Sequence, residues 1–134
     1  VSVAGALGVS VWCFGFLFET VSDWQLFRFK HDPYRTASVM TEGLWRYSRH
    51  PNYFGEAVLW WGIFLLALPV PHGVWTVISP LVINVLLLRV SGVPMLEKKY
   101  KDDPEYRAYR QTTNAFFPWA PRPASGERNG AGQS

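Results

Sequence analysis

Hydrophobic residues are concentrated in three long blocks, which are separated by polar segments. The first block runs from Val1 to Phe18 without a charged residue. The second runs from Tyr53 to Val70 with one acidic residue, and the third from Val74 to Leu88 with Pro80 inside it. These lengths lie near the roughly 17 to 25 residues that cross a bilayer as a helix. The pattern therefore predicts three apolar helices, and a membrane helix bundle tolerates the internal proline.

The turn between the second and third blocks and the placement of basic residues predict how the helices are arranged. The segment PVPHG, from Pro69 to Gly73, has two prolines and a glycine, which are typical of a tight turn. The second and third helices should then form an antiparallel hairpin. Lys and Arg are absent before Arg28 and between Arg49 and Arg89, so they flank the apolar blocks. By the positive-inside rule, both flanking segments should lie on the cytoplasmic side.

The polar C-terminal part is expected to contain a helical region and a disordered tail. Residues 96–114 combine charged side chains with tyrosines, and Pro104 should interrupt the helix there. The end of the chain is rich in Pro, Gly and Ser, which predicts a disordered tail over residues 123–134. We therefore expect residues 1–122 to form one all-α, polytopic membrane helical bundle, with three apolar helices and a cytoplasmic tail helix. Because the chain begins at Val1 without a methionine, we interpret it as a C-terminal fragment whose upstream helices are missing.

Composition and charge narrow the function classes. Hydrophobic residues make up 49% of the chain and the formal net charge is +3. Because the basic residues flank the apolar blocks, the charge indicates contact with membrane lipids and not nucleic acid. The single Cys13, the lack of a histidine cluster and the lack of an HExxH motif give no metal site. Without a GxGxxG motif, any nucleotide would be bound outside a Rossmann fold.

The densest polar motif is GLWRYSRHPNYFGE, residues 43–56, directly before the second apolar block. Pro51 suits the first position of a helix, whose free N–H groups would then face Arg46, Arg49 and His50. A helix N-terminus beside arginines is suited to a phosphate or another anion. Alternatively, the arginines only anchor the helix to lipid headgroups.

Two pairs of polar residues with one-turn spacing accompany this motif. Asn52 and Glu56 are one helical turn apart and should project from one face. A carboxylate inside an apolar span costs roughly 2.5 kcal/mol or more at the helix centre, so Glu56 should face a partner arginine or a polar cavity. Such a carboxylate could bind a ribose, a nicotinamide amide or a cationic cofactor. Glu19 and Asp23 repeat the spacing at the end of the first block, where a capping role is the alternative.

Arg89 lies where the third block meets the polar tail. It is either a basic anchor that reaches the lipid headgroups or part of a pocket. In the second case Glu97, Tyr106 and Tyr109 would close that pocket, because tyrosine can stack on a ring or donate a hydrogen bond.

Several segments in order resemble one family. The motifs GLWRYSRHPNYFGEAVLWWG, LLLRVSGVPMLEKKY and EYRAYRQTTNAFFPWAPR, with SDWQL before them, are similar to the DUF1295 family of steroid 5-alpha-reductase-like membrane proteins. The resemblance extends from about Phe18 to Arg122. It implies an enzyme that uses NADPH to reduce a carbon–carbon double bond in a lipophilic substrate, such as a steroid, an enone or a lipid. The C-terminal helices of such reductases carry the cofactor pocket.

The resemblance also implies roles for single residues. Asn52 and Glu56 match the cofactor motif of the reductases, and His50 matches its sterol-reductase form. Lys30 stands where the steroid reductases have an arginine, so the phosphate contacts should differ. The carbonyl-activating residues of those enzymes lie on an upstream helix, which leaves the catalytic residues of this chain unknown. The expected cofactor-binding residues are Asp23, Lys30, Arg46, Arg49, His50, Asn52, Tyr53, Glu56, Arg89 and Tyr109.

Two other functions stay open from the sequence. The RHPxYxG core is also similar to the isoprenylcysteine carboxyl methyltransferases, in which case His50 and Tyr53 would line an S-adenosylmethionine pocket. The reductase family additionally accounts for SDWQL and Glu56, and we therefore prefer it. The third alternative is a non-enzymatic membrane scaffold.

Overall fold

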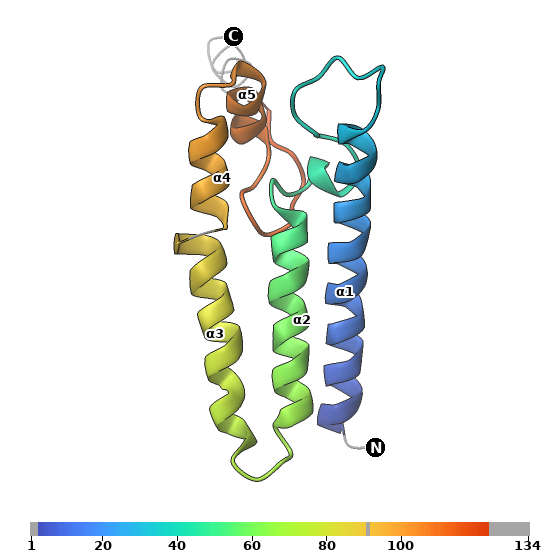
Figure 1. Cartoon of the computed structure of the whole chain (residues 1–134). Coiled ribbons are helices and arrows are strands. Elements are labelled where there is room, and N and C mark those ends of the chain that lie inside the picture. The colour runs from blue at the N-terminus through green and yellow to red at the C-terminus, as the bar shows by residue number, and fades with distance from the viewer. Residues whose placement is uncertain (1–2, 91, 124–134) are drawn as a thin grey trace.

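The structure is a computed structural model, and it describes residues 3–90 and 92–123. These residues form helices and no β-strand (Figure 1). The α-helices are α1 (Val3–Lys30), α2 (Pro51–Ala67), α3 (Ile78–Val85), α4 (Val93–Tyr100) and α5 (Pro104–Thr112). Shorter helical turns cover Gly43–Arg46, Gly73–Val77 and Leu86–Val90. The prediction of an all-helical fold is confirmed for this part of the chain.

Two helical segments are long and apolar enough to cross a membrane. The first is α1, and the second is the run Gly73–Tyr100, in which α3 and α4 follow one another nearly in line (Figure 1). The most apolar parts of these runs have mean hydropathies of 1.5 and 1.8. Only 11% of that part of α1 is buried inside the molecule, so most of its apolar side chains face outward. Such exposure suits a lipid-facing helix better than the core helix of a soluble protein.

Helices α1 and α2 pack closely along a seam of glycines. Gly8 of α1 faces Gly62 of α2, and Gly15 of α1 faces Gly55 of α2. On each helix the two glycines are seven residues apart. A Cβ atom placed on Gly55 would lie 2.5 Å from the backbone N of Glu19 and 2.8 Å from the carbonyl oxygen of Gly15. The backbones therefore touch directly. Small residues at such positions are a common way of packing helices in membranes, where burial of apolar surface gives little driving force.

A short turn connects α2 to the following helix at the end opposite the polar segments (Figure 1). His72 has a positive φ of 62°, and Gly73 after it has no room for a side chain beside the carbonyl oxygen of Ala67. The predicted antiparallel hairpin at PVPHG is confirmed. Pro80 lies in the first turn of α3, where a missing N–H group breaks no helical hydrogen bond, so the helix tolerates this proline.

The polar segments gather at the other end of the bundle. The loop after α1, the Gly43–Arg46 turn, α5 and the following chain all lie there (Figure 1). Pro51 begins α2, and Pro104 begins α5 after a break at the end of α4, as predicted. The first helix continues twelve residues beyond the apolar block, to Lys30, because QLFRFK extends the helical segment without a breaker. The predicted disordered tail falls, apart from Pro123, outside the described residues.

Candidate functional site

The entry to α2 is tied to the chain that follows α5. Ser48 is fully buried, and its hydroxyl donates a hydrogen bond of 2.7 Å to the carbonyl oxygen of Phe116. The Ser48 hydroxyl oxygen in turn accepts a hydrogen bond from the backbone N–H of His50 at 3.1 Å. The backbone N–H of Arg49 donates to the carbonyl oxygen of Asn114 at 2.8 Å. These bonds fix the directions in which Arg49 and His50 leave the backbone.

Glu97 on α4 is the centre of a polar cluster at this end. Its carboxylate accepts hydrogen bonds from the guanidinium of Arg49 and from the hydroxyl of Tyr106 on α5. The Nε of Arg49 also donates to the carbonyl oxygen of Thr113 at 3.1 Å. The Arg49 and Glu97 side chains are only 10% and 15% exposed, so this ion pair is largely shielded from water. It connects the start of α2 to the two C-terminal helices.

His50 lies beside this cluster and is almost completely buried, with 2% exposure. Its ring is parallel to that of Tyr53, with centroids 5.5 Å apart. Its Nε2 is 3.8 Å from a carboxylate oxygen of Glu97, which is too long for a hydrogen bond. Neither ring nitrogen has a hydrogen-bond partner among the described residues. The imidazole is thus held by packing, with unused hydrogen-bonding capacity.

Tyr109 links α5 to the chain before α2. Its hydroxyl hydrogen bonds to the carbonyl oxygens of Trp45 and Ser48, the latter at 3.0 Å. The indole Nε1–H of Trp45 donates in turn to the carbonyl oxygen of Ser22 on α1 at 3.0 Å. This chain of bonds joins α5, the Gly43–Arg46 turn and α1. These hydrogen bonds fix the positions of the Tyr109 and Trp45 rings.

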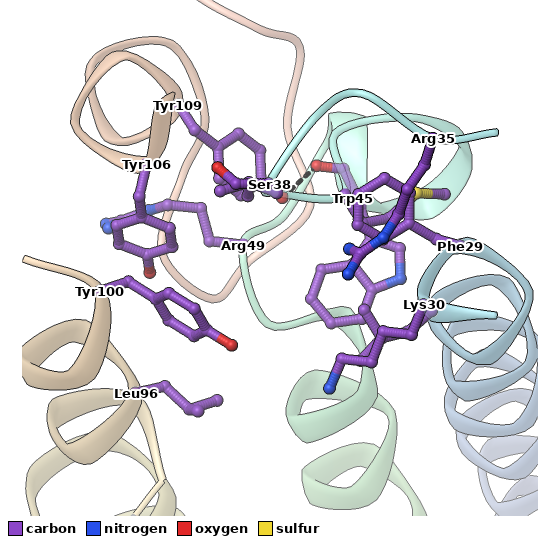
Figure 2. Close-up of a pocket in the computed structure, with 13 residues that line it drawn as sticks. Phe29, Lys30, Arg35, Ser38, Trp45, Arg49, Leu96, Tyr100, Tyr106 and Tyr109 are labelled. Carbon is purple, nitrogen blue, oxygen red and sulfur yellow. Dashed lines mark hydrogen bonds between the residues drawn. The ribbon is translucent and has the colours of Figure 1, made fainter. Parts of the chain in front are cut away.

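A cavity of about 400 Å³ opens between these elements. Figure 2 shows Lys30 and Arg35 on the α1 side of the cavity and Tyr100 and Tyr106 on the α4–α5 side. Among its lining residues are three cations and no carboxylate. Aromatic rings form much of the remaining wall. The lining residues are Leu26, Phe29, Lys30, Arg35, Ser38, Val39, Met40, Trp45, Arg49, Leu96, Tyr100, Tyr106 and Tyr109.

A second polar group lies at the α1–α2 seam and does not line this cavity. Glu56 and Asp23 both interact electrostatically with Glu19 and also with the hydroxyl of Tyr53. The side-chain oxygen of Asn52 accepts from the backbone N–H of Tyr53 at 3.0 Å. The two polar pairs predicted from the sequence, Asn52/Glu56 and Glu19/Asp23, are therefore neighbours. Neither Ser22 nor Asp23 caps α1, because the helix continues past both.

The structure groups some of the expected cofactor-binding residues and separates others. Lys30, Arg49 and Tyr109 line the cavity, and His50 lies beside the Arg49–Glu97 pair. Arg46 is exposed, with its guanidinium 6.0 Å from the ring of Tyr47. Arg89 is exposed on the helical turn after α3, and its side chain forms no hydrogen bond or ion pair with another residue that the structure describes. The expected cluster around the α2 N-terminus is thus divided into a basic cavity and an acidic seam.

Several residues of the site were not predicted from the sequence. Arg35 and Trp45 both line the cavity. In the sequence, their basic and aromatic side chains were the only signals that could have indicated this. Glu97 was expected to help close a pocket around Arg89, and it pairs with Arg49 instead. A single sequence carries no direct signal for these contacts, since Arg49 and Glu97 are 48 residues apart.

Tyr109 is expected to stay protonated where an exposed tyrosine ionises. Burial raises the pKa of its hydroxyl, and the nearby Tyr106 adds to the effect. The neutral hydroxyl therefore contributes stability below the ordinary tyrosine pKa of about 10, and this contribution is lost only as the pH rises beyond that value. In an alkaline titration of tyrosinate absorbance, Tyr109→Phe should leave the step near pH 10 unchanged. A smaller step in Tyr109→Phe would contradict the buried hydroxyl.

The comparisons with known proteins identify the family. A family model described as "Protein of unknown function (DUF1295)" matches residues 1–113. No curated protein and no solved structure matches the chain. The chain belongs to the DUF1295 family, as its sequence motifs indicated.

Proposed function

We propose that this DUF1295 chain is the cofactor-binding part of a membrane oxidoreductase, which uses NADPH to reduce a carbon–carbon double bond in a lipophilic substrate. The observation that carries the proposal is the cavity at the polar end of the bundle. It combines Lys30, Arg35 and Arg49 with aromatic walls and has no acidic lining residue. Phosphates are bound by such cations, and an adenine ring can stack on aromatic side chains.

The size of the cavity indicates which part of the cofactor it would hold. A volume of about 400 Å³ lies in the lower part of the roughly 300 to 1,000 Å³ range of small-molecule sites. We assign it to the phosphate-bearing nucleotide end. Asn52 and Glu56, outside the cavity, would contact the nicotinamide end. The nicotinamide supplies the hydride when bound, and the protein orients it and excludes water.

The membrane placement follows the same proposal. Helix α1 and the run Gly73–Tyr100 would cross the bilayer with α2 as a third span between them. The polar end, where Lys and Arg gather, would face the cytoplasm, the compartment that supplies a soluble nucleotide. The lipophilic substrate would reach the site from the membrane. Residues upstream of this chain would supply the proton donor.

One observation favours a second candidate, an S-adenosylmethionine-dependent methyltransferase of the isoprenylcysteine type. The rings of His50 and Tyr53 of the RHPxYxG core are stacked, and the His50 Nε2 lies 3.8 Å from a carboxylate oxygen of Glu97. In this alternative the same cavity would hold the carboxylate of S-adenosylmethionine with its basic residues. The acidic seam around Glu56 has no role in it, and we therefore rank it second.

A thermal-shift titration of the protein in lipid nanodiscs separates these functions. We expect NADPH to raise the melting temperature, since a ligand at 100 times its dissociation constant adds about 2.7 kcal/mol to the folded state. Glu56→Gln should weaken that shift, because it removes the proposed contact to the nicotinamide end.

Stabilisation by S-adenosylmethionine and not by NADPH would reverse the ranking. If neither cofactor stabilises the protein at millimolar concentration, the non-enzymatic scaffold becomes the better description. Glu42→Gln is the matched control, because Glu42 is an exposed carboxylate that does not line the nucleotide cavity.

A further inference from the structure

The loop between α1 and the Gly43–Arg46 turn forms one wall of the nucleotide cavity. Four of its residues line the cavity: Arg35, Ser38, Val39 and Met40. The loop projects from the polar end of the bundle, beyond the end of α1 (Figure 1). Residues 31–38 are all exposed on their other side. The loop is thus a thin cover with the cavity beneath it.

Ser38 fastens this loop to the start of α5. Its backbone N–H donates to a carboxylate oxygen of Glu105 at 2.7 Å, and its hydroxyl donates to Asp103 at 2.7 Å. The other carboxylate oxygen of Asp103 caps α5 by accepting from the backbone N–H of Glu105 at 2.9 Å. One loop residue thus uses both of its donors on two neighbouring carboxylates, 65 and 67 residues away in sequence.

The rest of the loop has only local hydrogen bonds. The backbone N–H groups of Tyr34 and Arg35 donate to Asp32, two and three residues away. Among the described residues, the two Ser38 bonds are the only hydrogen bonds between residues 32–42 and residues 93–112. Both are exposed to water, which competes for their partners. Segments with few buried contacts and exposed hydrogen bonds open at low free-energy cost.

Arg35 gives the loop a ligand-binding group. Its guanidinium lies 5.0 Å from the ring of Phe29 and on the same side of the cavity as Lys30 (Figure 2). It forms no ion pair with another described residue, so its charge is available to a ligand. When the loop moves away, the cavity loses a wall and one of its three cations together.

We propose that residues 31–42 form a lid over the nucleotide cavity, which Ser38 latches to Asp103 and Glu105 and which carries Arg35 as an additional phosphate-binding residue. The identity of the ligand rests on the proposed function, whereas the latch does not. The closed lid shields the phosphates from water, and release of the Ser38 bonds opens the path for the cofactor. Lids of this kind commonly control ligand entry and release.

Hydrogen exchange of the full-length protein in lipid nanodiscs tests the latch without any ligand. Ser38→Ala removes the hydroxyl bond and should accelerate exchange of the backbone amide of residue 38, which donates to Glu105, by roughly 2- to 10-fold, the factor expected for one net hydrogen bond. Thr36→Ala is the matched control, because the Thr36 hydroxyl is exposed and bonds to no described residue. Equal exchange rates in Ser38→Ala and Thr36→Ala would overturn the lid.

NADPH and Arg35→Met test the ligand contact. NADPH should slow exchange of residues 35–42 in the unchanged protein. Arg35→Met should weaken NADPH binding about 10-fold, with little change in melting temperature before ligand is added. If NADPH binds but leaves loop exchange and the Arg35→Met affinity unchanged, the lid inference fails and the cofactor proposal stands. If Ser38→Ala loosens the loop but NADPH does not bind, the cofactor proposal fails and the latch stands.

Discussion

Replacing Glu97 by alanine is expected to lower the free energy of unfolding by about 3 kcal/mol, because it leaves a shielded arginine without its partner. Arg49 is only 10% exposed, and its remaining bond to the carbonyl oxygen of Thr113 does not neutralise its charge. The hydroxyl of Tyr106 loses its acceptor in the same variant. Both losses act on the contacts between α2 and the two C-terminal helices. Denaturant unfolding in detergent micelles, followed by circular dichroism, measures the change.

Asp102→Ala is the control for this experiment. Asp102 is also a carboxylate near the end of α4, but its side chain is 87% exposed and lies 3.9 Å from Arg107. An exposed pair of this kind contributes about 0 to 1 kcal/mol. If Glu97→Ala costs no more than Asp102→Ala, the polar cluster does not hold the C-terminal helices in place.

Replacing Gly55 by leucine should separate α1 from α2 and cost about 3 kcal/mol, at the upper end of usual overpacking effects. A Cβ atom alone would approach backbone atoms of Glu19 and Gly15 within 2.8 Å, and a backbone cannot rotate out of the way as a side chain can. The higher helix propensity of leucine offsets only about 1 kcal/mol of this cost. Thermal unfolding in nanodiscs measures the loss.

Cys13→Leu is the matched control on α1, because it adds apolar volume at an exposed position of the same helix. We expect it to change the melting temperature little. Equal melting temperatures for Gly55→Leu and Cys13→Leu would show that the helices are not in backbone contact.

The sequence predicted the helices where strong local signals exist. Pro51 and Pro104 mark the starts of α2 and α5, since proline is favoured in the first turn of a helix. The hairpin turn followed from two prolines and a glycine in a short segment. The glycine seam was missed because Gly8, Gly15, Gly55 and Gly62 lie within uniformly apolar helices, where small residues give no contrast in hydrophobicity.

The sequence predicted where in the bundle the charged residues of the candidate site lie, but it did not predict which of them form ion pairs. Basic and acidic residues do gather at one end of the bundle, as their positions beside the apolar blocks indicated. From the sequence we expected the Arg49 side chain to lie at the N-terminus of α2, whereas in the structure it forms an ion pair with Glu97. Such pairing depends on how α4 and α5 fold back onto the bundle, which no local pattern encodes. The loop that completes the cavity has no motif of its own.

Isothermal titration of the protein in nanodiscs with NADPH tests the nucleotide site most directly. Lys30 lines the cavity, is exposed and forms no ion pair with a described residue, so Lys30→Met should weaken binding about 10-fold without unfolding the protein. Lys98→Met removes an equal charge from α4 outside the cavity and should leave the affinity unchanged. Measurable NADPH binding that falls in Lys30→Met alone is the predicted result. No NADPH binding, or equal affinity in both variants, would contradict a cofactor site in this cavity.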